Sequence, residues 1–128
     1  MAIYQDYGTL PGLVAGGDLS SSQYLVVKVA STAGAVIVGA TKASDLLLGI
    51  LQNDPAEGYA AEVAAWGVCK AKAAASVTYG SKLSCNSTGQ VVSSTTDKDE
   101  IIGIALKASS STAGDIIPVL LTRFTLSE

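Results

Sequence analysis

Few side chains in this chain of 128 residues could carry out chemistry, and the clearest candidates are its two cysteines, Cys69 and Cys85. Two thiols could form a disulfide or bind a metal ion. A structural zinc site needs four cysteine or histidine ligands, and the sequence contains no histidine. The pattern therefore favours two small buried thiols in a reducing compartment, although spacing alone leaves a disulfide open.

A second candidate is the acidic group formed by Asp97, Asp99 and Glu100. Carboxylates bind hard cations, but this spacing is not that of an EF-hand loop. We expect the group to lie in a solvated turn between strands, with a weak cation site as the alternative. The tripeptide Asn-Ser-Thr at residues 86–88 fits a glycosylation acceptor, but without a signal peptide it is most simply a turn.

The single tryptophan, Trp66, could stack on a ligand ring, although a core or interface anchor is the more common role. Because histidine is absent, the chain lacks the commonest general base and the Ser/His and Cys/His nucleophile pairs. No glycine-rich phosphate-binding motif occurs in the sequence. The sequence predicts a protein that is not an enzyme and that binds no metal or cofactor.

Composition and charge argue against direct binding to nucleic acid or membranes. The net charge is −3 and the 8 Lys and Arg residues are scattered singly, whereas nucleic-acid binders cluster them. No apolar run reaches the roughly 18 residues that span a bilayer, and no charged leader precedes an apolar segment. We expect a soluble protein made in a cytoplasm. Charged residues make up only 15%, which favours a subunit that hides part of its surface in an oligomer or on a larger body.

The elements that position these residues form an internal repeat. Residues 27–66 and 81–122 read alike, and each contains an apolar-Gly-Ile signature, around Gly49 in one copy and Gly103 in the other. Val63 and Val119 each follow a further glycine by five residues. Two copies are too few for a solenoid, so the repeat predicts a duplicated β unit that closes on itself.

Short apolar runs bounded by turn residues predict strands at residues 24–29, 46–52, 101–107 and 116–122. The alanine-rich segment 60–75 could form a helix, but its small residues alternate with larger or polar ones, which favours a strand. The predicted fold class is all-β, a small β-barrel or β-tulip-like domain. Hairpin turns are expected at Gly34, Gly80 and Gly89, and a sheet edge or bulge at Pro118.

Residues 1–17 lie outside the repeat and are expected to form an extended N-terminal arm. A single β domain follows at residues 18–128, with repeat halves at about 24–67 and 80–123. The arm is either a disordered terminus or a strand that docks on a neighbouring subunit. The candidate contact residues of the arm are its large apolar and aromatic side chains, Ile3, Tyr4, Tyr7, Leu10 and Leu13.

Three stretches carry a resemblance to a known family. They are VAGGDLSSSQYLVVKV at residues 14–29, LLGILQNDPAEGYAAEVAAWGVCKAKA at residues 47–73 and IIGIALKASSSTAGDIIPVLL at residues 101–121. Together they resemble the small capsid decoration, or cement, proteins of tailed bacteriophages, over roughly residues 14–122.

The resemblance implies a structural virion protein on the outer capsid surface, made in the host cytoplasm. Such proteins clamp neighbouring major capsid subunits, often as homotrimers. The implied partners are the major capsid protein and further copies of this chain, without direct nucleic acid or membrane contact, and the arm becomes a candidate capsid contact. The alternatives are a tail or head-fibre component and a module that binds a host-surface glycan.

Overall fold

The computed structural model describes residues 6–30, 36–39, 47–95, 98–108 and 114–125. These residues form ten β-strands: β1 (Asp6–Thr9), β2 (Val14–Ala15), β3 (Val26–Val29), β4 (Val36–Gly39), β5 (Leu47–Leu51), β6 (Val63–Lys72), β7 (Lys82–Cys85), β8 (Val91–Ser93), β9 (Glu100–Ala105) and β10 (Ile116–Thr125). The predicted all-β class is confirmed. The described residues include no helix long and apolar enough to cross a membrane.

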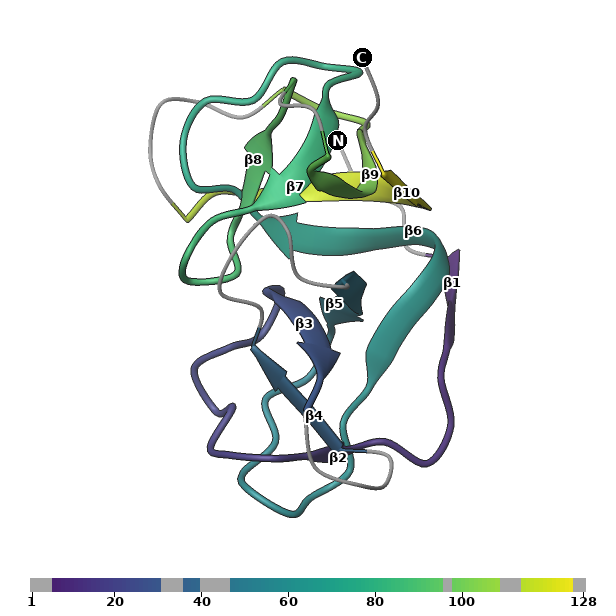
Figure 1. Ribbon diagram of the computed structural model, residues 1–128, viewed down its shortest axis with the longest axis vertical. Helices are drawn as coiled ribbons and strands as arrows, with labels where there is room; N and C mark the ends of the chain where they lie inside the picture. The colour runs from purple at the N-terminus through teal and green to yellow at the C-terminus, as the bar shows by residue number, and fades with distance from the viewer. Residues whose placement is uncertain (1–5, 31–35, 40–46, 96–97, 109–113, 126–128) are drawn as a thin grey trace.

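The alanine-rich segment forms a strand, β6, as its alternation predicts. Cys69 and Ala71 are fully buried, whereas Trp66 and Lys70 on the other face reach solvent. Figure 1 shows β6 as a long, strongly bent strand that links a lower group of strands, β2 to β5, with an upper group, β7 to β10. Its first residues pair with β5 and its later residues pair with β10.

The two halves of the repeat have the same strand pairing. In the first half β3 pairs with β4 and β5, and β5 pairs with β6. In the second half β7 pairs with β8 and β9, and β9 pairs with β10. The β6–β10 pairing joins the halves into one sheet with the order β2-β4-β3-β5-β6-β10-β9-β7-β8. The predicted duplication of a β unit is confirmed at the level of these pairings.

Each half is nearly closed into a small barrel by a single bridge. In the first half Val14 bridges antiparallel to Ala60, just before β6. In the second half Ala73, just after β6, bridges in parallel to Val91 of β8. Closure of this kind leaves few unpaired strand edges, which are otherwise sites of unwanted pairing.

The signature glycines have the same structural role in both halves. A Cβ on Gly49 would lie 2.2 Å from the carbonyl oxygen of Ala64 and 2.7 Å from a Val63 methyl. A Cβ on Gly103 would lie 2.5 Å from the Leu120 carbonyl oxygen and 2.6 Å from a Val119 methyl. Each glycine thus lets the next strand of its own half approach closely, which explains why the apolar-Gly-Ile signature occurs twice.

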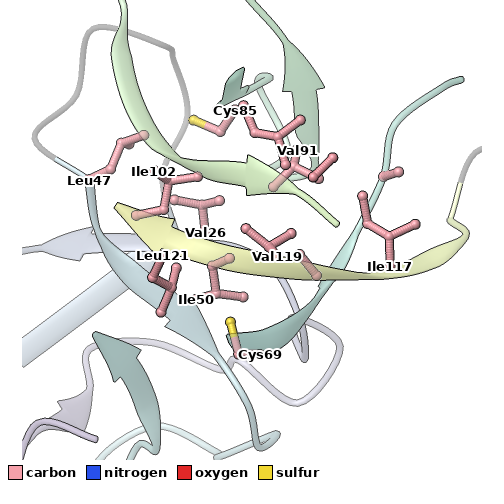
Figure 2. Close-up of a cluster of buried hydrophobic side chains, with 14 of the residues drawn as sticks. Val26, Leu47, Ile50, Cys69, Cys85, Val91, Ile102, Ile117, Val119 and Leu121 are labelled. Atoms are coloured by element: carbon pink, nitrogen blue, oxygen red, sulfur yellow. The ribbon is translucent and has the colours of Figure 1, made fainter. Parts of the chain in front are cut away.

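The core consists of two clusters of buried side chains. The larger cluster draws on both halves, because Val26, Leu47 and Ile50 of the first half pack with residues of β7, β9 and β10 (Figure 2). Cys69 and Cys85 belong to this cluster, and they form no disulfide with each other. The smaller cluster lies in the first half and comprises Ala15, Leu19, Val27, Ile37, Leu51, Ala61 and Val63.

Some details differ from the sequence-based expectations. Gly89 lies in the β7–β8 hairpin as expected, but Gly80 lies in a turn between β6 and β7, which do not pair with each other. Gly34 lies outside the described residues. Pro118 pairs with β6 beyond the point where the β9 ladder ends, so its missing N–H costs no ladder bond on that side.

Candidate functional site

Of the N-terminal residues that the sequence singled out, the structure describes Tyr7, Leu10 and Leu13. Strand β1 pairs antiparallel with β6 and lies off the main strand order. Tyr7 packs against the larger core cluster, and its hydroxyl donates a 2.6 Å hydrogen bond to the Glu62 carboxylate. Burial, followed by this hydrogen bond, raises the pKa of Tyr7 to about 12. The ring therefore serves to fasten β1 to its own chain.

Leu10 and Leu13 also contact their own chain. The Leu10 N–H donates to the Val63 carbonyl at 3.2 Å, and the Leu13 carbonyl accepts from the Ala61 N–H at 2.9 Å. The Leu13 side chain packs against the smaller core cluster. Ile3 and Tyr4 lie outside the described residues. Contact of any of these five residues with another subunit stays a prediction.

Trp66 is more than half exposed, at 57%, and its ring lies against Gly8 of β1. Its partner across the β1–β6 ladder is Gly8. A Cβ on Gly8 would lie 1.8 Å from Cε2 of the indole, so glycine at this position leaves room for the ring where it lies. The side chain therefore helps to hold β1 on β6 and still presents apolar area to solvent.

The acidic group does not converge on one point within the described residues. The Asp99 carboxylate accepts a 2.6 Å hydrogen bond from the Ser94 hydroxyl, whereas the Glu100 carboxylate accepts from the Thr125 hydroxyl. Asp97 lies outside the described residues. No group of three or more His, Cys, Asp or Glu side chains positioned to hold a metal ion occurs in the described part of the chain.

The motifs that carry the family resemblance bind one another. Gln23 donates through Nε2 to the Gln52 carbonyl at 3.0 Å, and the Tyr24 N–H donates to the Leu51 carbonyl at 2.6 Å. Asn53 then closes the loop that follows β5, because its amide donates to the Ala60 carbonyl and accepts from the Glu62 N–H. These polar residues therefore hold the framework together.

The most extended surface feature is a row of five side chains that crosses five neighbouring strands. Cross-strand partners in an antiparallel ladder point to the same face of a sheet. Four such pairs follow one another across the sheet and place their residues side by side on the outer face. The pairs are Asp6–Val68, Val68–Leu120, Leu120–Ile104 and Ile104–Lys82. We call Asp6, Val68, Leu120, Ile104 and Lys82 the outer row.

The residues next to the outer row on the same five strands are also cross-strand partners, and they lie on the inner face of the sheet. They are Tyr7, Gly67, Leu121, Gly103 and Leu83. Two of the five are glycines, Gly67 and Gly103, which are the cross-strand partners of Leu121 on its two sides. In the outer row, by contrast, Leu120 is 39% exposed although β10 is paired on both sides. The centre of the outer row is apolar, with an acid at one end and a base at the other.

Only part of the outer row could be predicted from the sequence. The alternation along residues 60–75 puts Val68 among the larger residues on one face of the predicted strand, so the β6 member of the row was predictable. Asp6, Leu120, Ile104 and Lys82 were missed, because the register that aligns them joins residues far apart in the sequence. The scarcity of charge was the one sequence signal that a surface of this kind exists.

The family model for phage cement proteins matches residues 20–121. A search of curated protein sequences finds no match. Among solved structures, the head fiber gp8.5 N base of bacteriophage phi29 is similar, with a TM-score of 0.69 and 13% sequence identity. The similarity covers 91% of this chain and 95% of that one, and at this identity it shows a shared fold alone. Since the family match spans most of the strands, this chain belongs to the phage cement protein family.

Proposed function

We propose that this chain binds the outer surface of a phage capsid and stabilises the shell by clamping neighbouring major capsid subunits. The observation that carries the proposal is the cement-family match over residues 20–121, which includes strands β3 to β9 and most of β10. Membership of this family makes the chain a structural component of a phage virion. We further propose that it is made in the host cytoplasm and has no catalytic activity.

The physical basis of the proposed clamp is multivalency. A subunit can contact two capsid subunits, and a homotrimer can contact several. Once the first contact has formed, the remaining binding sites are held near the capsid at a high effective concentration, which favours the later contacts. Modest contacts then give stable attachment without any one of them being strong. The single sheet that joins the two halves through β6 and β10 supports this role, because a clamp whose halves came apart would not resist separation of the subunits it joins.

We propose that the arm divides into two parts with different roles. Tyr7, Leu10 and Leu13 fasten the arm to its own chain through the contacts described above. Ile3 and Tyr4 precede this fastened part and are the arm residues that we assign to contact with the capsid. A short apolar segment of this kind adds contact area at low cost, since tyrosine has few rotatable bonds.

Cosedimentation with purified capsids tests the proposal. The full chain is expected to pellet with expanded empty capsids and to saturate at a fixed number of copies. Deletion of residues 1–5 is expected to weaken binding, and the matched control is the double substitution Ser20→Ala with Ser21→Ala in an exposed segment. Absence of the full chain from the capsid pellet would refute capsid binding. Unchanged binding after the deletion would refute only the role of the arm.

A second candidate function is the base of a head fibre. The similarity to the head fiber base of bacteriophage phi29 favours it, since 91% of this chain shares that fold. The two functions differ in their effect on the shell. A fibre base is expected to attach without raising the temperature at which the capsid is disrupted, whereas a clamp is expected to raise it.

A further inference from the structure

The two ends of the outer row carry opposite charges, and this asymmetry indicates what covers it. Asp6 on β1 and Lys82 on β7 are both exposed, and three apolar side chains lie between them. We propose that the outer row is the contact between copies of this chain in a cyclic homo-oligomer, with Asp6 of one copy beside Lys82 of the next. This inference rests on the proposed function in so far as the decoration protein acts as an oligomer.

The apolar centre provides the reason for association. Leu120 is 39% exposed, and its cross-strand neighbours Val68 and Ile104 are half-buried. Pro118 lies on the same face, two residues before Leu120, and Trp66 lies two residues before Val68. An apolar strip of this kind that runs across β6, β10 and β9 gains free energy when a partner removes it from water.

The strip is not needed to complete the core of its own subunit. Leu121 and Leu83 point inward from the same strands and are buried in the larger cluster. The side chains of the outer row stand on the opposite face of the sheet, where Asp6, Leu120 and Lys82 are exposed to solvent. A partner is therefore required if Leu120 is to be buried.

Charge complementarity selects a second copy as that partner and fixes the direction of the symmetry axis. A rotation axis that runs parallel to the strands, past Leu120, places the β1 end of each row beside the β7 end of the next copy. The Asp6 carboxylate then meets the Lys82 ammonium group at every contact. An axis that runs across the strands would instead bring Asp6 beside Asp6, and like charges in contact oppose association.

The same axis suits the shape of the subunit. The outer row lies on the convex side of a nearly closed sheet, with its apolar centre on β10 and its charges two strands away on either side. Copies arranged around an axis would meet first at their apolar centres. The charged ends would then lie at the rim, where a polar margin is usual in protein interfaces.

Sedimentation velocity of the full chain tests the inference. The wild-type chain is expected to sediment as a closed oligomer at about 100 µM, a concentration well above the Kd of a specific contact. Leu120→Ser is expected to shift it to monomer. The matched control is Tyr59→Ser, which removes a side chain 70% exposed on the loop that follows β5. All variants are compared only if their urea unfolding midpoints show that they fold.

Charge reversal tests the pairing of the two ends. Asp6→Lys alone and Lys82→Asp alone are each expected to raise the concentration of half-assembly about fivefold or more at low salt. The double variant Asp6→Lys with Lys82→Asp is expected to return to within about twofold of the wild type. A double variant that is no better than the single variants would overturn the proposed pairing.

The outcomes separate this inference from the proposed function. A wild-type chain that stays monomeric at about 100 µM overturns the inference, as does an oligomer that Leu120→Ser leaves intact. If the monomer still binds capsids and Leu120→Ser abolishes that binding, the row meets the capsid instead, and the proposed function stands without the self-contact. If the oligomer behaves as expected but never binds capsids, the inference stands and the proposed function fails.

Discussion

The indole ring of Trp66 lies directly on the backbone of Gly8, so that strand β1 is held on β6 by a side chain as well as by the ladder between them. The absence of a Cβ at position 8 is what makes this contact possible, because such an atom would lie 1.8 Å from Cε2 of the ring. Trp66 is the only tryptophan of the chain. When the indole is excited selectively, its emission therefore reports on the surroundings of this one side chain.

Gly8→Ala is expected to displace the Trp66 ring from β1. The ring is a side chain beside solvent and can rotate away, so the expected loss of unfolding free energy is modest, about 1 kcal/mol. The displaced indole enters water, which is expected to shift its emission to longer wavelength. Fluorescence and urea denaturation measure both effects.

The control for this substitution is Gly17→Ala, because nothing lies within 4 Å of a Cβ at Gly17. It is expected to leave the emission and the unfolding midpoint unchanged. If Gly8→Ala gave the same spectrum as Gly17→Ala, the indole would not lie on β1.

Gly49→Ala and Gly103→Ala are expected to destabilise the protein more strongly than Gly8→Ala. In both cases the new methyl group meets a backbone carbonyl oxygen, at 2.2 Å for Gly49 and 2.5 Å for Gly103. A backbone atom cannot move aside as a side chain can, so we expect a loss of about 2–3 kcal/mol for each. Denaturant unfolding measures the loss, with Gly39→Ala in β4 as the strand control, because its Cβ would meet nothing within 4 Å. A neutral result at either signature glycine would contradict the close approach of the strands.

The stability of the protein is expected to fall as the pH rises above about 9. Burial raises the pKa of the Cys69 thiol from 9.0 to about 12, and burial with the Glu62 hydrogen bond raises the pKa of Tyr7 from 10.0 to about 12. A raised pKa means that the folded state favours the protonated form. The resulting stabilisation is complete below the unfolded pKa and is lost as the pH approaches the folded one.

Tyr7→Phe removes one of these two groups and is expected to make the loss between pH 10 and 12 less steep. Urea midpoints measured across the alkaline range give the slope, and Tyr59→Phe, at an exposed tyrosine, is the matched control. An identical slope for Tyr7→Phe and the wild type would show that Tyr7 does not keep its proton in the folded state.

Both thiols are expected to resist modification in the folded protein. Cys69 is fully buried and Cys85 is 2% exposed, so a thiol reagent reaches them only when the structure opens. Reaction with a chromogenic disulfide reagent is expected to be slow in buffer and complete in guanidinium chloride. Fast reaction in buffer, or a chain that migrates as oxidised on a non-reducing gel, would contradict two buried thiols that are not joined in a disulfide.

Much of the framework could be predicted from the sequence because its signals are local. Alternation along residues 60–75 identifies a strand, since small side chains recur at every second position on the side that β6 buries. The repeat of Gly49 and Gly103 relates two distant segments, and the structure gives both glycines the same close contact. These features depend only on neighbouring residues and on comparison within the chain.

The rest depends on contacts between distant residues. Strand β1 has four residues, and one of them is Gly8, whose lack of a Cβ accommodates the Trp66 ring from a distant part of the chain. Its apolar pattern is therefore too short and too interrupted to indicate a strand. Predicting the outer row likewise requires the register of four strand pairings, because only these registers place Asp6 and Lys82 at the two ends of one surface.

The measurement that tests the central claim most directly is the temperature at which expanded empty capsids are disrupted, followed by calorimetry with and without saturating amounts of the chain. A clamp binds the intact shell and not its separated subunits, so mass action predicts that disruption shifts to higher temperature as the chain is added, until the sites are full. An unchanged disruption temperature, under conditions where sedimentation shows the chain on the capsids, would contradict the clamp and favour a head-fibre base.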